Sequence, residues 1–248
     1  MKNRIDHESL LAEAMQVLRT GPDGAALVAL TRLMAFSPGF GPGYLAWGDR
    51  VSRKGGGGNG LSLLRKALIA GPQDARVYQR LSDLEYRRRE IEKAGWYARA
   101  CLLLTPGNSG AFRVLSSAAF HRKDHDLAVR LLASARCISS PKGPDLLILM
   151  WALFELDRLA ECVQVARWFL LVSPGNADGY TLFARVLARQ DELVPAAIQV
   201  GRLERLKPGD PDVLLAKGRV ARARRWYNGA CRSFRRALLT EPSRGEGM

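Results

Sequence analysis

Cysteine, acidic residues and long apolar runs are scarce in this sequence of 248 residues. The four cysteines, Cys101, Cys137, Cys162 and Cys231, form no Cys-X-X-Cys pair and are too few for a disulfide scaffold. We therefore expect them to be buried thiols in a reducing cytoplasm. The apolar run that begins at Leu146 is well short of the roughly 20 residues that span a membrane. The N-terminus also lacks the uninterrupted apolar segment of a secretory signal.

The motifs of common enzyme classes are missing as well. Neither a nucleophile turn of the type Gly-X-Ser-X-Gly nor a dinucleotide-binding glycine pattern occurs. The glycine run at 55–60 is followed by Leu61 and Ser62, not by the Lys-Ser/Thr of a phosphate-binding loop. We expect a flexible loop there that shortens the next helix, because glycine disfavours helix interiors. His121 and His125 should flank a turn, with no third ligand nearby, so we expect no catalysis, no cofactor and no metal site.

Positive charge is the one unusual quantity. The chain has 38 Lys and Arg against 24 Asp and Glu, a formal net charge of +14, which suggests an anionic partner without identifying it. Residues 1–40 are neutral, whereas residues 201–248 carry 12 basic and five acidic side chains, which is half of the excess. This uneven distribution favours a polarised docking surface over a general affinity for polyanions.

Prolines recur with a 34-residue step, and such an internal repeat decides the organisation of the chain. The step joins Pro38, Pro72, Pro106, Pro174, Pro208 and Pro242, and Pro141 stands one residue from the missing position. Proline cannot continue a helix, because it lacks the amide donor and clashes with the preceding turn. Two residues after four of these prolines come side chains that favour helix N-caps, Asp74, Asn108, Asn176 and Asp210.

Small residues recur in the same frame. With the proline at position 32, repeats start at residues 7, 41, 75, 109, 143, 177 and 211. Position 20 is small in every repeat: Ala26, Gly60, Ala94, Ala128, Cys162, Ala196 and Ala230. Position 8 is small in six of the seven repeats. We expect two antiparallel helices, A and B, that cross closely where positions 8 and 20 meet.

The pattern resembles the tetratricopeptide repeat (TPR) family over residues 7–242. The sixth repeat carries it well, through Tyr180, Phe183, Ala184, Leu187, Ala196, Val200, Leu203 and Pro208. The resemblance implies an all-α fold, a single right-handed superhelical solenoid of antiparallel helix pairs with tails at 1–6 and 243–248. The RNA-binding pentatricopeptide arrays have a 35-residue period and lack this series of prolines.

The last repeat is expected to be atypical. The six residues after Pro242 are too few for the additional capping helix that many TPR arrays carry, so apolar atoms of Trp226, Phe234 or Leu238 should be partly uncovered. Such a face invites a partner or a second copy of the chain. The alternative is a face small enough to tolerate water.

In TPR-like geometry the A helices line a concave groove, and the resemblance therefore indicates candidate binding residues. They are Arg76, Arg80, Tyr86, Arg87, Arg113, Trp151, Phe154, Arg185, Arg189, Arg219 and Arg222. Arg and aromatic side chains are common anchors of binding hot spots, and the planar guanidinium group suits carboxylates and phosphates. The alternative is that these residues form ordinary solvated helix faces.

We expect a non-catalytic scaffold or adaptor that binds an acidic or amphipathic segment of a partner protein. TPR domains that grip chaperone C-termini have Asn at position 9, which here reads Asp49, Asp83, Ser117, Trp151, Arg185 and Arg219, so that ligand is not expected. The alternatives are binding of a polyanion, such as nucleic acid or an acidic polysaccharide, and a targeting subunit of a transferase or secretion assembly. Polyanion binding should weaken steeply with salt.

Overall fold

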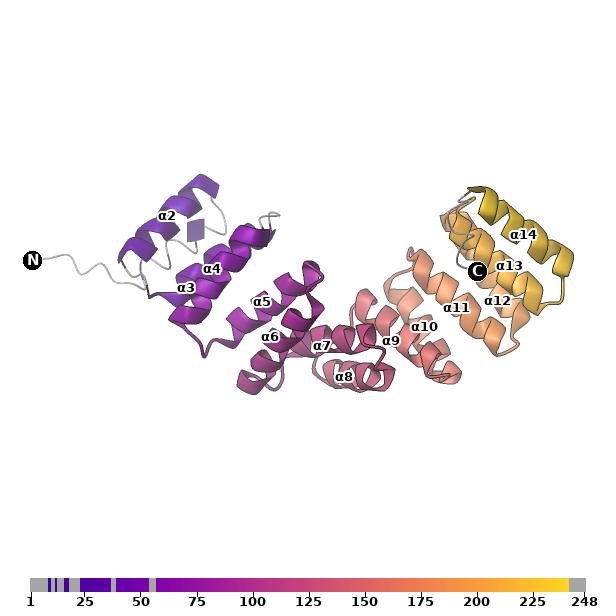
Figure 1. Ribbon diagram of the computed structural model, residues 1–248, viewed down its shortest axis with the longest axis horizontal. Coiled ribbons are helices and arrows are strands. Elements are labelled where there is room, and N and C mark those ends of the chain that lie inside the picture. The colour runs from indigo at the N-terminus through magenta and orange to yellow at the C-terminus, as the bar shows by residue number, and fades with distance from the viewer. Residues whose placement is uncertain are drawn as a thin grey trace, which may run out of the picture. The chain divides into compact units, whose positions relative to one another are not determined.

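The computed structural model describes residues 9, 12, 16–17, 23–36, 39–53 and 57–240. Every regular element in these residues is an α-helix (Figure 1). The helices are α2 (Asp23–Phe36), α3 (Gly41–Arg53), α4 (Gly57–Ala70), α5 (Ala75–Arg87), α6 (Ile91–Leu104), α7 (Ser109–His121), α8 (His125–Ile138), α9 (Gly143–Glu155), α10 (Leu159–Val172), α11 (Ala177–Arg189), α12 (Leu193–Leu206), α13 (Pro211–Ala223) and α14 (Tyr227–Thr240). None of these helices combines the length and the apolar character that crossing a membrane requires.

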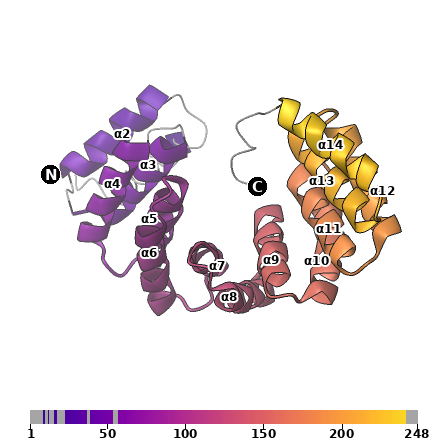
Figure 2. The same ribbon diagram turned by 45° about the vertical axis from the view of Figure 1, so that its right-hand side comes forward.

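The helix bounds confirm the 34-residue period. The A helices α3, α5, α7, α9, α11 and α13 each have 13 residues and begin 34 residues apart, and the B helices from α2 to α14 each have 14 residues with the same step. The two helices of a repeat lie side by side in both ribbon views (Figures 1 and 2). Most of the A helix expected in the first repeat lies outside the described residues.

The chain divides into two compact units, residues 1–118 and 119–248, and each is described by itself. The first unit contains α2 to α6 and most of α7, and the second contains the end of α7 and α8 to α14. One uninterrupted solenoid over residues 7–242 therefore stays a prediction.

Side-chain caps start the A helices where the sequence predicts them. The Asp74 carboxylate accepts a hydrogen bond from the Arg76 amide at 2.9 Å, and the Asn176 side chain accepts one from the Gly179 amide at 3.0 Å. Asn108 and Asp210 cap α7 and α13 in the same way. Each cap satisfies an amide that has no partner within its helix.

The close crossing of the A and B helices is confirmed at positions 8 and 20. The Ser82 hydroxyl donates to the carbonyl of Ala94 at 3.0 Å, and the Cys162 thiol donates to the carbonyl of Met150 at 3.2 Å. Such side-chain contacts with the opposite backbone require two helices in close approach. A larger residue at position 20 would force the two helices apart.

The prediction that the glycine run shortens the next helix is wrong for α4. This helix starts at Gly57 and has 14 residues, as α6 does, so the glycines do not shorten it. A Cβ atom on Gly60 would lie 3.1 Å from the Gly48 carbonyl oxygen and against the Ser52 side chain. Close packing of α3 on α4 therefore requires glycine there and outweighs its low intrinsic helix propensity. Gly55 and Gly56 lie outside the described residues.

In the five repeats from α5 to α14, the turn from the A helix to its B helix has one repeated conformation. Its second residue has a positive φ between 57° and 63°, at Arg89, Lys123, Asp157, Asp191 and Arg225. The amide one residue later returns to the carbonyl five residues before it, as from Arg158 to Leu153 at 2.9 Å. This bond pattern ends a helix with a left-handed residue. In the second unit the turn presents the Asp157 side chain beside α11.

The core of the second unit is formed by facing sides of α9 to α13. Phe169, Leu182 and Leu187 are among its most buried side chains, with at most 2% of their surface exposed. The core of the first unit gathers Leu64 and Leu81. Full burial of such a side chain stabilises a fold by about 1.5–3 kcal/mol. These cores fix which sides of α9, α11 and α13 remain available to a ligand.

Candidate functional site

The A helices of the second unit bring predicted binding residues together. We define the A-helix face of the second unit by Trp151 and Phe154 of α9, Arg185 and Arg189 of α11, and Arg219 of α13. The helix α11 packs against both α9 and α13, so the three helices present neighbouring side chains. All five residues were predicted as groove residues from the sequence.

Two guanidinium groups lie on the aromatic rings of this face. The Arg185 Cζ atom is 5.0 Å from the centre of the Trp151 ring and 4.8 Å from that of Phe154. The Arg189 Cζ atom is 4.9 Å from the centre of the Phe154 ring. The two rings meet edge to face, with centres 6.1 Å apart and planes at 90°. Cations in this position are attracted by the negative ring faces, and the rings hold the guanidinium groups in place.

Burial and like charges surround Arg185. Burial lowers the pKa of the Arg185 guanidinium, the positive charges of Arg219 and Arg189 lower it further, and only Glu155 opposes them. The group nevertheless stays protonated, because a guanidinium does not lose its proton in proteins. A half-buried cation beside two others is therefore a place where an incoming carboxylate gains interaction energy.

Arg189 is held from two sides. Its Nη2 atom is 3.5 Å from an Asp157 carboxylate oxygen, and its Nη1 atom donates to the Phe154 carbonyl at 3.4 Å. Asp157, which occupies the turn after α9, is not among the residues predicted from the sequence. The repeat frame contained a signal for it, because the turn falls at the same position in every repeat.

Phe154 is more buried than is expected of a residue that lines a groove. Its ring is 6% exposed and belongs to the core cluster of the second unit, whereas Trp151 is half-buried. The guanidinium groups of Arg185 and Arg189 cover the Phe154 ring. Trp151 and the guanidinium groups are therefore the more exposed parts of the face.

Two predicted arginines of the first unit, Arg76 and Arg80, are engaged with carboxylates. Arg80 Nε is 3.1 Å from an Asp49 carboxylate oxygen. Arg76 contacts both carboxylate oxygens of Asp74, at 3.0 and 2.9 Å, and thereby lowers the pKa of Asp74. Arg87 lines a cavity of about 180 Å³ together with Arg80 and two Asp residues. These positive charges already have negative neighbours in the folded chain.

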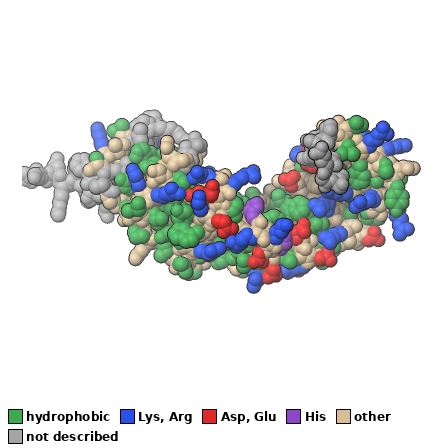
Figure 3. Space-filling model, viewed as in Figure 1, with side chains coloured by type: hydrophobic (Ala, Val, Ile, Leu, Met, Phe, Trp, Pro, Cys, Tyr) green, Lys and Arg blue, Asp and Glu red, His purple; other side chains and the backbone are tan. Residues whose placement is uncertain are grey.

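Three further candidates are placed by other contacts. The Tyr86 hydroxyl is 2.8 Å from the Ser117 hydroxyl, and the Arg113 Nε atom donates to the Ser109 carbonyl at 3.2 Å. Arg222 is exposed near the end of α13. On the side in view in Figure 3, basic side chains are interspersed with acidic ones. Charge alone therefore does not mark a binding site on that side.

Other sequence candidates are located in the structure as well. His121 ends α7 and His125 begins α8, so a turn separates them, and the described residues hold no group of three metal-ligating side chains. Trp226 is 61% and Leu238 is 41% exposed at the last repeat. Phe234 is half-buried, and a Cβ atom on Gly218 would lie 2.5 Å from its ring, so Phe234 packs on α13.

Comparisons with solved structures decide the fold. YrrB, described as a TPR protein with an unusual peptide-binding site, matches 72% of this chain and 92% of its own at 17% identity, with a TM-score of 0.64. PilF of Pseudomonas aeruginosa matches 82% of this chain and 92% of its own at 17% identity, with a TM-score of 0.66. The chain has the tetratricopeptide-repeat fold.

A third TPR protein covers nearly the whole chain. The protein from Parabacteroides merdae matches 95% of this chain and 93% of its own at 14% identity, with a TM-score of 0.64. No protein-family model and no curated protein sequence matches this chain. The TPR fold is therefore recognised through the helix arrangement and through the proline and small-residue positions quoted above, while the identity of the ligand has to come from the site.

Proposed function

We propose that this protein is a non-catalytic scaffold that binds an acidic or amphipathic segment of a partner protein on the A-helix face of the second unit. The observation that carries the proposal is Arg185, which is half-buried between two aromatic rings and beside two other arginines. A carboxylate of the partner would relieve the repulsion among these cations. Trp151 would offer apolar surface to a neighbouring side chain of the same segment.

The binding energy would come from a small number of contacts. Charged groups on a preformed aromatic support lose little conformational freedom when they bind, since the rings already restrict them. Arg and Trp are the side chains most enriched among residues that dominate interface energies. YrrB, which has the same fold, is described as containing a peptide-binding site, and this supports a peptide-like ligand for a TPR surface.

Affinity capture from native extract tests the proposal, with the wild-type chain compared with the Trp151→Ala/Arg185→Glu double variant. We expect the wild type to retain a partner that the double variant loses, with circular dichroism unchanged between them. An Arg76→Glu/Arg80→Glu variant is the matched control, because it changes charge on α5, and it should retain the partner. Equal capture by the wild type and the double variant would contradict the proposal.

Salt separates this proposal from polyanion binding. An apolar anchor keeps part of the affinity in moderate salt, whereas release of counterions from a polyanion makes affinity fall steeply.

We also keep a cytoplasmic location and self-association through the exposed Trp226 and Leu238 as proposals. Sedimentation at increasing concentration tests the self-association, with Trp226→Ser as the variant that should reduce it.

A further inference from the structure

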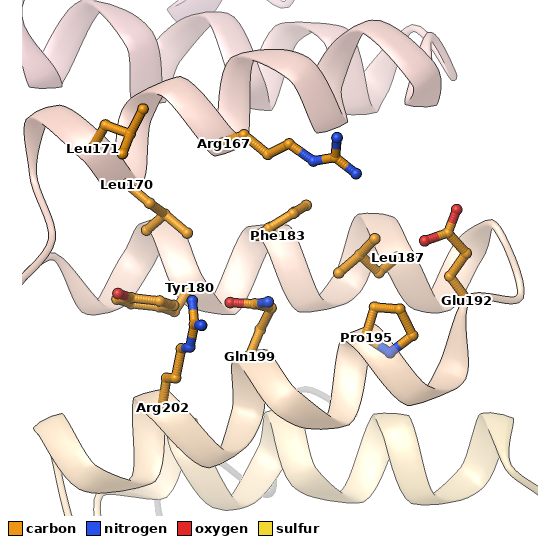
Figure 4. A pocket seen from close by; sticks show the side chains of 10 residues that line it. All are labelled: Arg167, Leu170, Leu171, Tyr180, Phe183, Leu187, Glu192, Pro195, Gln199 and Arg202. Carbon is orange, nitrogen blue, oxygen red and sulfur yellow. The ribbon is translucent and has the colours of Figure 1, made fainter.

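A second cavity lies on the other side of α11. It has a volume of about 430 Å³ and lies between the B helices α10 and α12, with α11 as its floor (Figure 4). The floor is apolar, with Tyr180, Phe183 and Leu187 each less than 10% exposed. The walls add Leu170 and Pro195, so an apolar side chain of a ligand would be surrounded by apolar atoms.

This cavity is distinct from the A-helix face. Residues along an α-helix turn by about 100° each, so Phe183 and Arg185 point about 200° apart on α11. Phe183 contributes to the cavity floor, whereas Arg185 lies on the rings of Trp151 and Phe154. A ligand in the cavity would therefore touch α11 on the side opposite to the proposed partner segment.

A polar atom in the cavity wall lacks a partner. The Gln199 side chain of α12 is 9% exposed, and its Oε1 atom is buried without a hydrogen bond. Figure 4 shows this amide beside Tyr180, on the side of the cavity that faces Phe183. Buried acceptors in folded proteins are nearly always paired, and leaving one unpaired costs free energy. A ligand that donates an N–H to Gln199 would remove this cost.

Two arginines border the cavity. Arg167 of α10 and Arg202 of α12 are exposed, and neither forms an ion pair within the described residues. Figure 4 places Arg202 beside Tyr180 and Gln199, and Glu192 at the opposite end near Pro195. Arg202 makes the end near Tyr180 positive, and Arg167 extends from α10 above Phe183 and Leu187 in the same view, so both walls of the cavity attract negative groups of a ligand.

A second copy of the chain fits this charge poorly. The exposed apolar residues of α14 stand among Arg232, Arg235 and Arg236, and the helix contains no acidic residue. Docking α14 of another molecule at Arg167 and Arg202 would bring like charges together, which is unfavourable. The chemistry of the cavity instead requires an N–H donor, a bulky apolar group and carboxylates in one ligand.

An extended acidic peptide supplies all three. We propose that the cavity is a second docking site, which takes an acidic segment of a partner protein in extended conformation. Its backbone N–H donates to Gln199 Oε1, one bulky apolar side chain packs on Phe183 and Leu187, and its carboxylates pair with Arg167 and Arg202. The floor from Tyr180 to Leu187 spans about 10 Å along the helix axis, the length of about three extended residues. Together, the A-helix face and this cavity would let one scaffold hold two partner segments.

The test uses two pools of short end-blocked peptides, each with a central Phe, Leu or Trp flanked by Asp and Glu in one pool and by Lys in the other. The readout is the side-chain amide signal of Gln199 in ¹⁵N-labelled full-length chain, assigned by its absence in Gln199→Leu. We expect the acidic pool to shift this signal and the Lys pool to leave it in place. No shift with the acidic pool, or an equal shift with both pools, would overturn the proposal.

Charge-reversal variants decide whether the two arginines bind the peptide. Arg167→Glu/Arg202→Glu should weaken the affinity for the acidic pool by roughly tenfold or more, as loss of charge-assisted contacts predicts. The matched control Arg205→Glu/Arg235→Glu and the Trp151→Ala/Arg185→Glu variant of the other face should bind as the wild type does. Unchanged affinity after reversal at Arg167 and Arg202 would overturn the proposal, as would a Gln199 shift that depends on protein concentration without peptide.

Discussion

Two arginines, one in each unit, have opposite surroundings, although the helices that carry them repeat the same geometry. Arg80 in the first unit lies 3.1 Å from the carboxylate of Asp49, whereas Arg185 in the second unit lies 5.0 Å from the centre of the Trp151 ring. Asp49 and Trp151 occupy the same position, the ninth, of their repeats. The residue at this position therefore supplies a carboxylate beside Arg80 and an aromatic ring beside Arg185.

The comparison shows how a repeat scaffold can localise binding. A guanidinium group paired with a carboxylate of its own chain has to break that pair before it binds a partner. A guanidinium group on an aromatic ring is positioned by the ring and keeps its full charge. A high count of Lys and Arg is thus a poor guide to the binding site, and the residues beside each arginine are a better one.

The largest expected effect comes from reversing the two charges that lie on the aromatic rings of the second unit. Arg185→Glu/Arg189→Glu should lower the affinity for the captured partner segment about a hundredfold, since both residues belong to the class that dominates interface energies. Isothermal titration calorimetry measures the change. Arg76→Glu/Arg80→Glu makes the same charge change in the first unit and should lower affinity less than about threefold. Equal losses in the two variants would remove the distinction between the units.

A smaller effect is expected when the second unit is given the carboxylate of the first. Trp151→Asp places an acceptor beside Arg185 and removes the ring, so partner affinity should fall about tenfold. Trp151→Phe keeps an aromatic face and should remain close to the wild type. If Trp151→Asp binds as well as the wild type, the ring does not contribute and internal pairing does not compete with the partner.

The like charges themselves can be tested through stability. Arg219→Gln removes one of the cations that lower the pKa of Arg185, and the free energy of unfolding should rise by a few tenths of a kcal/mol, as for other exposed charge pairs. Urea denaturation followed by circular dichroism measures this. The same variant should bind the partner more weakly. A fall in stability would mean that Arg219 makes favourable contacts that outweigh the repulsion.

The smallest expected effect is that of low pH on the pair formed by Asp74 and Arg76 in the first unit. The side-chain hydrogen bond from Arg76 holds the pKa of Asp74 below its usual 3.8, so the carboxylate stabilises the fold above that pH, and the contribution is lost as pH falls through the lowered pKa. Carbon-detected NMR titration of Asp74 measures the midpoint. Arg76→Ala should raise the midpoint while the backbone cap remains. The aromatic contacts of Arg185 contain no group that titrates in this range.

The sequence predicted the helix pairs because the information is local. Each proline ends a helix, each Asp or Asn two residues later starts the next one, and small residues such as Ala94 mark the crossing. The α4 helix could not be predicted in the same way. Glycine propensity argued against a helix at Gly57 and Gly58, and only the close packing at Gly48 and Gly60 explains why it forms.

The binding surfaces were predictable to different degrees. The resemblance to TPR repeats placed Trp151 and Arg185 on the same side of the A helices, although it did not indicate that guanidinium groups would cover Phe154. The cavity at Gln199 had no sequence signal. It depends on the spacing between α10 and α12 and on a hydrogen bond that is not made, and neither quantity is written in a local pattern.

The most direct test of the central claim is an NMR titration of the labelled chain with the captured partner segment, observed at the Trp151 indole N–H and at the Arg Nε–H groups. The account predicts that the signals of Trp151 and Arg185 shift with the same binding constant, while those of Arg76 and Arg80 stay in place. Shifts confined to Arg76 and Arg80, with Trp151 and Arg185 unchanged, would contradict it.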